Sequence, residues 1–240
     1  MTGSNEIINQ IIKAIDNACE FCEKDFSHDE IIEILKSGND SEKQICLLKL
    51  NCIKNQEEAD LLVFHITDHH GIIRESAANK INEFVLNKQY LNFFRNKYAA
   101  DSFLKAINDV NPNICRTIIE ILGTIFEDNA LKNYFLENLY KRIDIVFDEI
   151  ERLKKSNWYT KKIFNLYWCL ETLGEINAPT DSNLISVLEK TCSFKEYTIR
   201  EKSAFVLSKL DNSCQEITKL KENLKNDENF YVKRYSKKFI

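Results

Sequence analysis

The sequence is poor in residues that interrupt helices. Only 5 of its 240 residues are glycine and 2 are proline, and these two residue types are the strongest local breakers of regular structure. Strand signals are also missing, because no run of strict apolar–polar alternation is closed by an Asn-Gly or Asp-Gly turn. Few breakers and no strand pattern predict a chain built almost wholly from helices.

A large excess of charge is also absent. The chain carries 33 basic and 37 acidic residues, a formal net charge of −4, so the whole molecule is not a polycation that would attract nucleic acid. No apolar run approaches the ~20 residues that a membrane span needs. Residues 1–15 have neither the basic nor the apolar part of a secretory signal. We therefore expect a cytoplasmic protein with no membrane segment.

The 8 cysteines lack the spacing of a zinc site. Cys19 and Cys22 form a Cys-x-x-Cys, but this is also one turn of an amphipathic helix, and no βαβ pattern accompanies it. His65 and His69 stand four residues apart, yet the glutamate that a zinc protease needs after the first histidine is missing. In a reduced compartment, such cysteines act as small apolar core residues. We expect no metal and no cofactor.

What the chain has instead is a repeated segment. Residues 71–84 and 197–210 each carry Ile-Arg-Glu, then a small residue, then apolar residues at helical spacing. A weaker copy contains Arg116. This residue follows Arg74 by 42 positions, and Arg200 follows it by 84, twice that interval, so one further unit is expected between them. Repetition at such a period predicts a stacked array of helical units.

An aspartate precedes most of these basic anchors by six or seven residues. We expect each aspartate to cap the following helix or to bond the basic side chain of its own or the adjacent unit. We interpret the whole set as a structural ladder between repeats and not as catalytic machinery. Its members are Asp68, Arg74, Asp109, Arg116, Arg200, Asp227 and Lys233.

This pattern resembles the HEAT repeat, including the HEAT-like repeats of the bilin-lyase type. That family has a helix, a turn with aspartate and often proline, and a second helix that opens with Val/Ile-Arg; residues 109–116 match it down to the proline. The resemblance covers about residues 27–240. It implies an all-α, right-handed α-α superhelix, a HEAT-like solenoid of about six helix pairs. It implies an architecture and not an activity.

We expect residues 1–26 to form a capping helix and residues 27–240 to form the array. In the third unit, the pattern predicts one helix over residues 90–107. In the fourth unit, the first helix is unusually long, and we expect it to be bent or broken near Arg142. We also expect self-association through the last helix, which is rich in aromatic residues. The six expected units are 27–54, 55–88, 89–127, 128–177, 178–211 and 212–240.

The second helices of HEAT arrays generally line the concave surface, and the resemblance implies the same here. Positions one, five and eight after each anchor would then face a partner. They are Glu75, Asn79, Asn82, Thr117, Ile121, Thr124, Glu201, Phe205 and Ser208. The set is mixed, and we expect Ile121 and Phe205 to be exposed apolar contacts, as in a protein-binding groove. No nucleophile, base and orienting group cluster there, so we expect no catalytic residues.

A second candidate surface is the stretch 152–162 in the irregular fourth unit. It holds five basic residues, two aromatic residues and no acidic residue. Basic side chains bind phosphates or carboxylates, and tryptophan or tyrosine can stack on a base or anchor a peptide. The alternative is a solvated turn. The residues of this basic–aromatic patch are Arg152, Lys154, Lys155, Trp158, Tyr159, Lys161 and Lys162.

We therefore predict a non-enzymatic scaffold that binds a protein partner on its concave face. Two alternatives stay open. The chain is similar in length and helical build to the HEAT-like alkylpurine DNA glycosylases, which implies nucleic-acid binding or DNA repair through the basic–aromatic patch, although the net charge disfavours it. The bilin-lyase resemblance implies a lyase or chaperone that acts on a tetrapyrrole.

Overall fold

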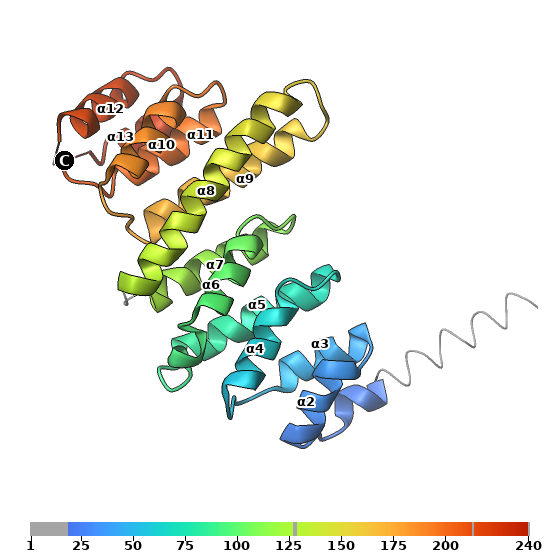
Figure 1. Cartoon of the computed structure of the whole chain (residues 1–240). Helices are drawn as coiled ribbons and strands as arrows, with labels where there is room; N and C mark the ends of the chain where they lie inside the picture. Colours follow the sequence, from blue (N-terminus) through green and yellow to red (C-terminus); the bar gives the residue numbers. More distant parts are fainter. Residues whose placement is uncertain (1–18, 127–128, 213, 240) are drawn as a thin grey trace, which may run out of the picture.

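The computed structural model describes residues 19–126, 129–212 and 214–239, and within these ranges it contains helices and no strand (Figure 1). It confirms the predicted all-α superhelix. Most of the predicted capping helix 1–26 lies outside the described residues, although residues 19–23 are helical.

The described helices come in pairs. The first helices of the pairs are α2 (His28–Ser37), α4 (Gln56–His65), α6 (Lys97–Ala106), α8 (Asn129–Leu153), α10 (Ser182–Cys192) and α12 (Gln215–Lys225). The second helices are α3 (Asp40–Lys49), α5 (Gly71–Leu86), α7 (Pro112–Ile125), α9 (Tyr159–Glu175), α11 (Tyr197–Leu207) and α13 (Phe230–Ser236). A short 3₁₀ helix, η1 (Leu91–Phe94), precedes α6.

Short polar residues start many of these helices. Ser27 and Asn39 each form a capping box with a glutamate three residues later, at the starts of α2 and α3. Asn96 and Asp181 cap α6 and α10 through a single side-chain oxygen. Pro112 opens α7, where its missing N–H costs no hydrogen bond. The helix starts are therefore encoded locally.

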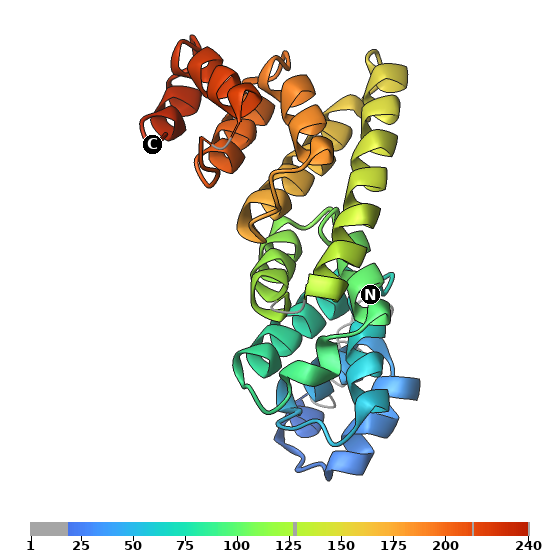
Figure 2. The same ribbon diagram turned by 60° about the vertical axis from the view of Figure 1, so that its left-hand side comes forward.

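The second helices pack side by side in one continuous row, α3–α5–α7–α9–α11–α13. The first helices form the other row, which runs α2–α4–α6–α8 and then α10–α12. This row loosens between α8 and α10, which meet through the ends of long side chains: Lys190 Nζ lies 5.3 Å from the centre of the Phe147 ring and 3.8 Å from an Asp144 carboxylate oxygen. Figure 2 shows α8 and α9 as a long hairpin between the lower and upper parts of the stack.

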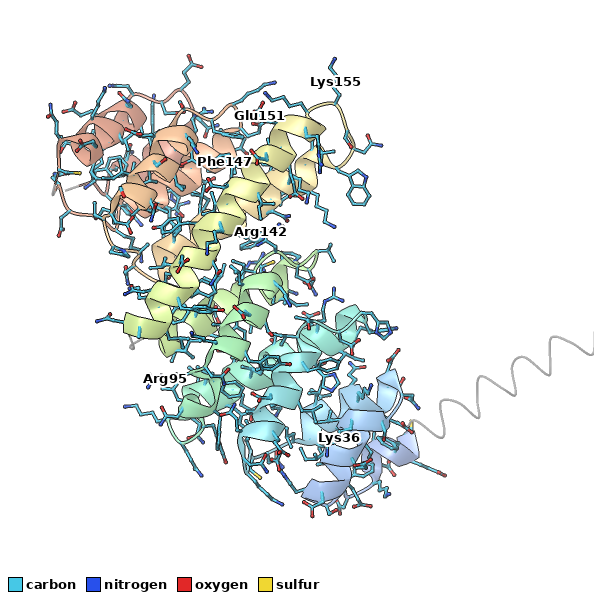
Figure 3. The ribbon with its side chains drawn as sticks, viewed as in Figure 1. Lys36, Arg95, Arg142, Phe147, Glu151 and Lys155 are labelled. Carbon is cyan, nitrogen blue, oxygen red and sulfur yellow. The ribbon has the colours of Figure 1, made fainter. Side chains whose placement is uncertain are left out.

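Two expectations about helix continuity are wrong. The predicted helix 90–107 is divided into η1 and α6, because Asn96 caps a new helix and its amide bonds the Phe93 carbonyl, 2.9 Å away. The helix α8 is continuous through Arg142 and shows no break; Figure 3 shows Arg142, Phe147 and Glu151 along one rod. Apolar residues on its inner side are buried along its whole length, so one uninterrupted helix covers the core.

The core runs without interruption from α2 to α13. Because α5, α7, α9 and α11 each have a second helix on both sides, their flanks are buried as well as their inner faces. Four of the cysteines, Cys46, Cys115, Cys169 and Cys192, are buried in this core as small apolar residues.

Candidate functional site

Arg74 joins two consecutive units. Its Nε donates to Asp109 Oδ2 at 2.6 Å and its Nη2 to Oδ1 at 3.1 Å, so the guanidinium holds the carboxylate by two parallel bonds. Its Nη1 donates to the carbonyl oxygens of Asp68 and His69 at 3.0 and 3.2 Å. Arg74 therefore closes the turn of its own unit and binds the aspartate of the next.

Arg200 repeats this arrangement near the other end of the array. Its Nε and Nη2 donate to Asp227 at 2.6 and 3.2 Å, and its Nη1 to the carbonyls of Phe194 and Lys195 at 2.8 and 2.9 Å. The sequence indicated that these aspartates could cap the following helices, but they do not. Each accepts instead from the backbone N–H two residues later, and Asn111 and Asn229 are the caps of α7 and α13.

Arg116 and Lys233 make no such joint, contrary to the expected ladder. Arg116 is exposed; it donates to Asn113 Oδ1 at 3.0 Å, and its guanidinium carbon lies 5.9 Å from the centre of the Trp168 ring. The turn before α9 contains no aspartate. The α8–α9 hairpin also carries that turn outward, with Lys155 at its tip in Figure 3. No carboxylate is therefore brought to Arg116.

A cavity of about 810 Å³ lies where this joint is missing, between α7, α9 and the start of α11. Its residues come from three consecutive units. They are Asp109, Val110, Pro112, Arg116, Thr160, Lys161, Phe164, Asn165, Tyr167, Trp168, Glu171, Thr198 and Glu201. We refer to this space as the α7–α9–α11 cavity.

The α9 wall of the cavity is largely aromatic. Phe164 is 53% exposed, and Tyr167 and Trp168 meet edge to face with ring centres 5.0 Å apart. Asn165 also lines this cavity, and it is only 5% exposed. Its amide has no hydrogen-bond partner among the described residues, and its atoms are not among the fully buried polar atoms of the structure. The cavity therefore contains an unused donor and acceptor beside an apolar surface.

The charges around the cavity are divided between paired and unpaired groups. Lys202 forms an ion pair with Glu171, and its Nζ lies 4.7 Å from the centre of the Tyr167 ring. Burial raises the pKa of Glu201; Lys202 opposes this shift, and the charge of Glu171 adds to it. Arg116 and Lys161 have no carboxylate partner in the described part of the chain. Two free cations therefore stand at one side of the cavity.

Most of the predicted concave-face residues lie outside this cavity. Only Glu201 lines it. Ile121 and Phe205 are buried, and the expectation that they are exposed is wrong, because neighbouring second helices cover both flanks of α7 and α11. Glu75 accepts from the amides of Asn111 and Asn113 at 2.9 and 3.0 Å, so it bridges units. The others are exposed or half-buried away from the cavity: Asn79, Asn82, Thr117, Thr124 and Ser208.

The basic–aromatic patch is partly neutralised by nearby carboxylates. Lys154 Nζ lies 2.5 Å from Glu151 and Lys162 Nζ 2.7 Å from Glu149, and the Tyr159 hydroxyl donates to Glu196 at 2.6 Å. Trp158 is 60% exposed, with Lys161 Nζ 5.2 Å from its ring centre. Arg152 and Lys155 are exposed at the tip of the hairpin. Of this patch, Lys161 alone reaches the cavity.

The histidines and cysteines singled out by the sequence do not come together. His65 is buried, with Nε2 2.9 Å from the Leu35 carbonyl, whereas His69 is exposed. Cys19 and Cys22 are exposed near the start of the described chain. Throughout the described ranges, no three His, Cys, Asp or Glu side chains are placed to hold a metal ion. Nor does any helix there have the length and apolar character to cross a bilayer.

Sequence reasoning missed Asn165 and Trp168. One signal for Asn165 was available: it is the only polar residue of the run Ile-Phe-Asn-Leu-Tyr-Trp-Cys-Leu at 163–170, once tyrosine is counted as apolar. An asparagine inside a buried helix needs partners. Nothing in the local sequence shows that Arg116, 52 positions before Trp168, would lie over that ring.

No protein-family model and no curated protein matches this chain. Among solved structures, an engineered protein superposes with a TM-score of 0.54 at 10% identity, covering 89% of this chain and 97% of its own. A designed armadillo repeat protein in complex with the peptide (KR)4 has a TM-score of 0.48 at 14% identity, covering 89% and 98%. The first likeness supports a helical repeat fold; membership of the HEAT family itself stays a prediction.

Proposed function

We propose that this chain is a non-enzymatic binding module that holds an extended segment of a protein partner in the α7–α9–α11 cavity. The observation that carries the proposal is Asn165, a cavity-lining residue that is only 5% exposed and whose amide has no hydrogen-bond partner among the described residues. A carboxamide has one acceptor oxygen and one NH₂ donor group, so it can bond both the N–H and the C=O of one residue of an extended backbone. Such a contact would give a hydrogen-bond partner to both the oxygen and the NH₂ group of the Asn165 amide.

The aromatic wall supports the same occupant. Phe164, Tyr167 and Trp168 offer a surface on which an apolar or aromatic side chain of the segment can be buried. Tryptophan and arginine are the residues that most often dominate binding energy in protein interfaces. Arg116 lies over Trp168, and both line the same cavity as Asn165.

The unpaired cations on the α7 and α9 walls favour an acidic segment on that side of the cavity. Arg116 and Lys161 lack carboxylate partners among the described residues, whereas Lys202 of α11 is already paired with Glu171. A glutamate or aspartate next to the apolar anchor would meet the two free cations. The cavity brings no nucleophile together with a base, so binding and not catalysis is the activity that it supports.

The test uses the Trp158→Phe variant, in which Trp168 is the remaining tryptophan. Peptides selected from a random display library on this variant are titrated while Trp168 fluorescence is followed. We expect selected peptides to share an apolar residue beside an acidic one. Asn165→Leu keeps the volume of the side chain and removes the amide, and should weaken binding by about tenfold, as expected for lost hydrogen bonds.

The matched control is Asn79→Leu, which makes the same replacement on the exposed face of α5 outside the cavity. It should bind the peptides unchanged. Equal affinity of the Asn165→Leu variant and its parent would contradict the proposal. Tight binding of duplex DNA with a steep dependence on salt would favour the nucleic-acid alternative instead, and an absorbance titration with a linear tetrapyrrole tests the other.

A further inference from the structure

A second constellation lies at the opposite end of the molecule, where α2 meets α4. Cys52 is in the loop between α3 and α4, and its Sγ lies 3.5 Å from Nδ1 of His28. Nε2 of the same ring lies 3.0 Å from Glu58 Oε2. The thiol, the imidazole and the carboxylate therefore form a continuous chain of hydrogen bonds from three segments of the protein.

Glu58 is held firmly in this chain. Its Oε2 also accepts from the backbone N–H of Lys54 at 2.8 Å, and its Oε1 accepts from the Asn55 amide at 3.2 Å. An ionised carboxylate only accepts hydrogen bonds, so His28 must carry a proton on Nε2. In the neutral ring, Nδ1 is then an acceptor, and the bond from Cys52 is Sγ–H to Nδ1.

The other cysteines have no such environment. Burial raises the pKa of Cys46 and Cys169 to about 11 and that of Cys115 and Cys192 to about 12, so these thiols are inert. Cys214 is half-buried, as Cys52 is, but no histidine contacts its sulfur in the described structure.

We propose that Cys52 is a nucleophilic thiol, with His28 as its base and Glu58 as the positioning residue, and that it exchanges with small disulfides such as glutathione disulfide. A nucleophile within hydrogen-bond reach of a base that a third group orients is the arrangement that activates cysteine. His28 is half-buried and Cys52 is partly open to solvent, so a small molecule can reach the sulfur.

The reaction is a thiol–disulfide exchange. Nδ1 of His28 takes the Cys52 proton, and the thiolate attacks one sulfur of the disulfide. A new S–S bond forms as the old one breaks, and the leaving thiolate takes the electron pair and then the proton from the imidazolium. The disulfide supplies the oxidising equivalent, and the products are a mixed disulfide on Cys52 and one free thiol.

The charged groups near His28 are few. On α2, Asp29 follows it, and this carboxylate is paired with Lys54 from the loop, 3.1 Å away. From α4, Glu58 faces the ring directly. The charged groups that face His28 are therefore the Glu58 carboxylate, at 3.0 Å, and the Asp29–Lys54 pair.

The test compares Cys52 with Cys214 in the same intact protein. Dithiodipyridine is added at neutral pH, and the mixed disulfides are located and timed by peptide mass mapping. Cys52 should react about tenfold faster than Cys214, because an ordinary thiol is only a few per cent ionised at pH 7. The ratio should fall toward one as the pH rises above the ordinary thiol pKa, where both sulfurs are thiolates.

His28→Asn should reduce the Cys52 rate to that of Cys214, and Glu58→Gln should reduce it by a smaller factor. Equal rates for Cys52 and Cys214 at neutral pH in the unaltered protein would overturn the proposal without any variant. An unchanged Cys52 rate in folded His28→Asn would overturn the role of the histidine.

Discussion

The joint between α5 and α7 and the joint between α7 and α9 differ in one residue pair, with large consequences. At the first, Arg74 bonds Asp109 by two hydrogen bonds and closes two carbonyls of its own turn. At the second, Arg116 occupies the corresponding place in the repeat but no aspartate faces it, and it lies over Trp168 beside a cavity.

This difference separates stacking from binding. In a solenoid, each unit contacts only its neighbours, so the joints supply the stability of the array. Where the arginine N–H groups between two units are already hydrogen-bonded, they are not available to a partner. Where the fourth unit departs from the repeat, the aromatic wall and the two unpaired cations line a cavity, and it is there that we propose a partner binds.

The largest expected effect is at the regular joint. Arg74→Ala leaves the Asp109 carboxylate, only 9% exposed, without its partner; we expect the free energy of unfolding to fall by about 2–4 kcal/mol. Arg116→Ala is the matched control, and should change it by less than about 0.5 kcal/mol. Urea denaturation measures both. Similar losses in the two variants would remove the distinction between the joints.

A second test compares the two glycines inside α7 and α9. A Cβ at Gly174 would overlap the ring of Phe205 from α11, whereas one at Gly123 would meet no atom. Gly174→Ala should cost about 1–3 kcal/mol of unfolding free energy through overpacking. Gly123→Ala should add about 0.5–1 kcal/mol, since alanine favours a helix. A stabilised Gly174→Ala variant would show that α9 and α11 are not packed this closely.

The joint at Arg200 should also make stability depend on pH. Burial raises the pKa of Asp227, but the hydrogen bonds from Arg200 and the Asn229 N–H, with the charge of Arg200, outweigh it and leave this pKa below its ordinary value. The stabilisation is therefore present above the ordinary aspartate pKa and is lost as the pH falls through the lowered one. When the free energy of unfolding is measured against falling pH, the Asp227→Asn variant should lack this part of the decrease. The same pH dependence in the variant and the parent would contradict the role of Asp227.

The smallest expected effect is at the tip of the fourth unit. Trp158 is 60% exposed and contacts Lys161. Trp158→Ala should change the free energy of unfolding by less than about 0.5 kcal/mol, as for other exposed sites. Thermal unfolding measures it, and a loss above about 2 kcal/mol would mean that this turn supports the fold.

The prediction of a concave face shows that the exposure of a residue does not follow from its position in the repeat. Offsets from an anchor place a residue on a helical face, but they do not show what covers that face. Ile121 and Phe205 were expected to be exposed, and neighbouring helices bury both. Conversely, Asn165 belongs to an apolar run and gave no repeat signal, yet its amide lines the cavity.

The sequence by itself determined the helices, their starts and the repeat, because apolar spacing and capping residues act within a few positions of one another. Ser27, Asn39 and Pro112 need no distant partner for this. Only the tertiary structure decided that Arg74 finds Asp109 while Arg116 finds no carboxylate, and that Cys52, His28 and Glu58 meet. Such contacts join residues 24 to 35 positions apart. They depend on the length of each helix and on how far its turn extends, and no local pattern encodes either.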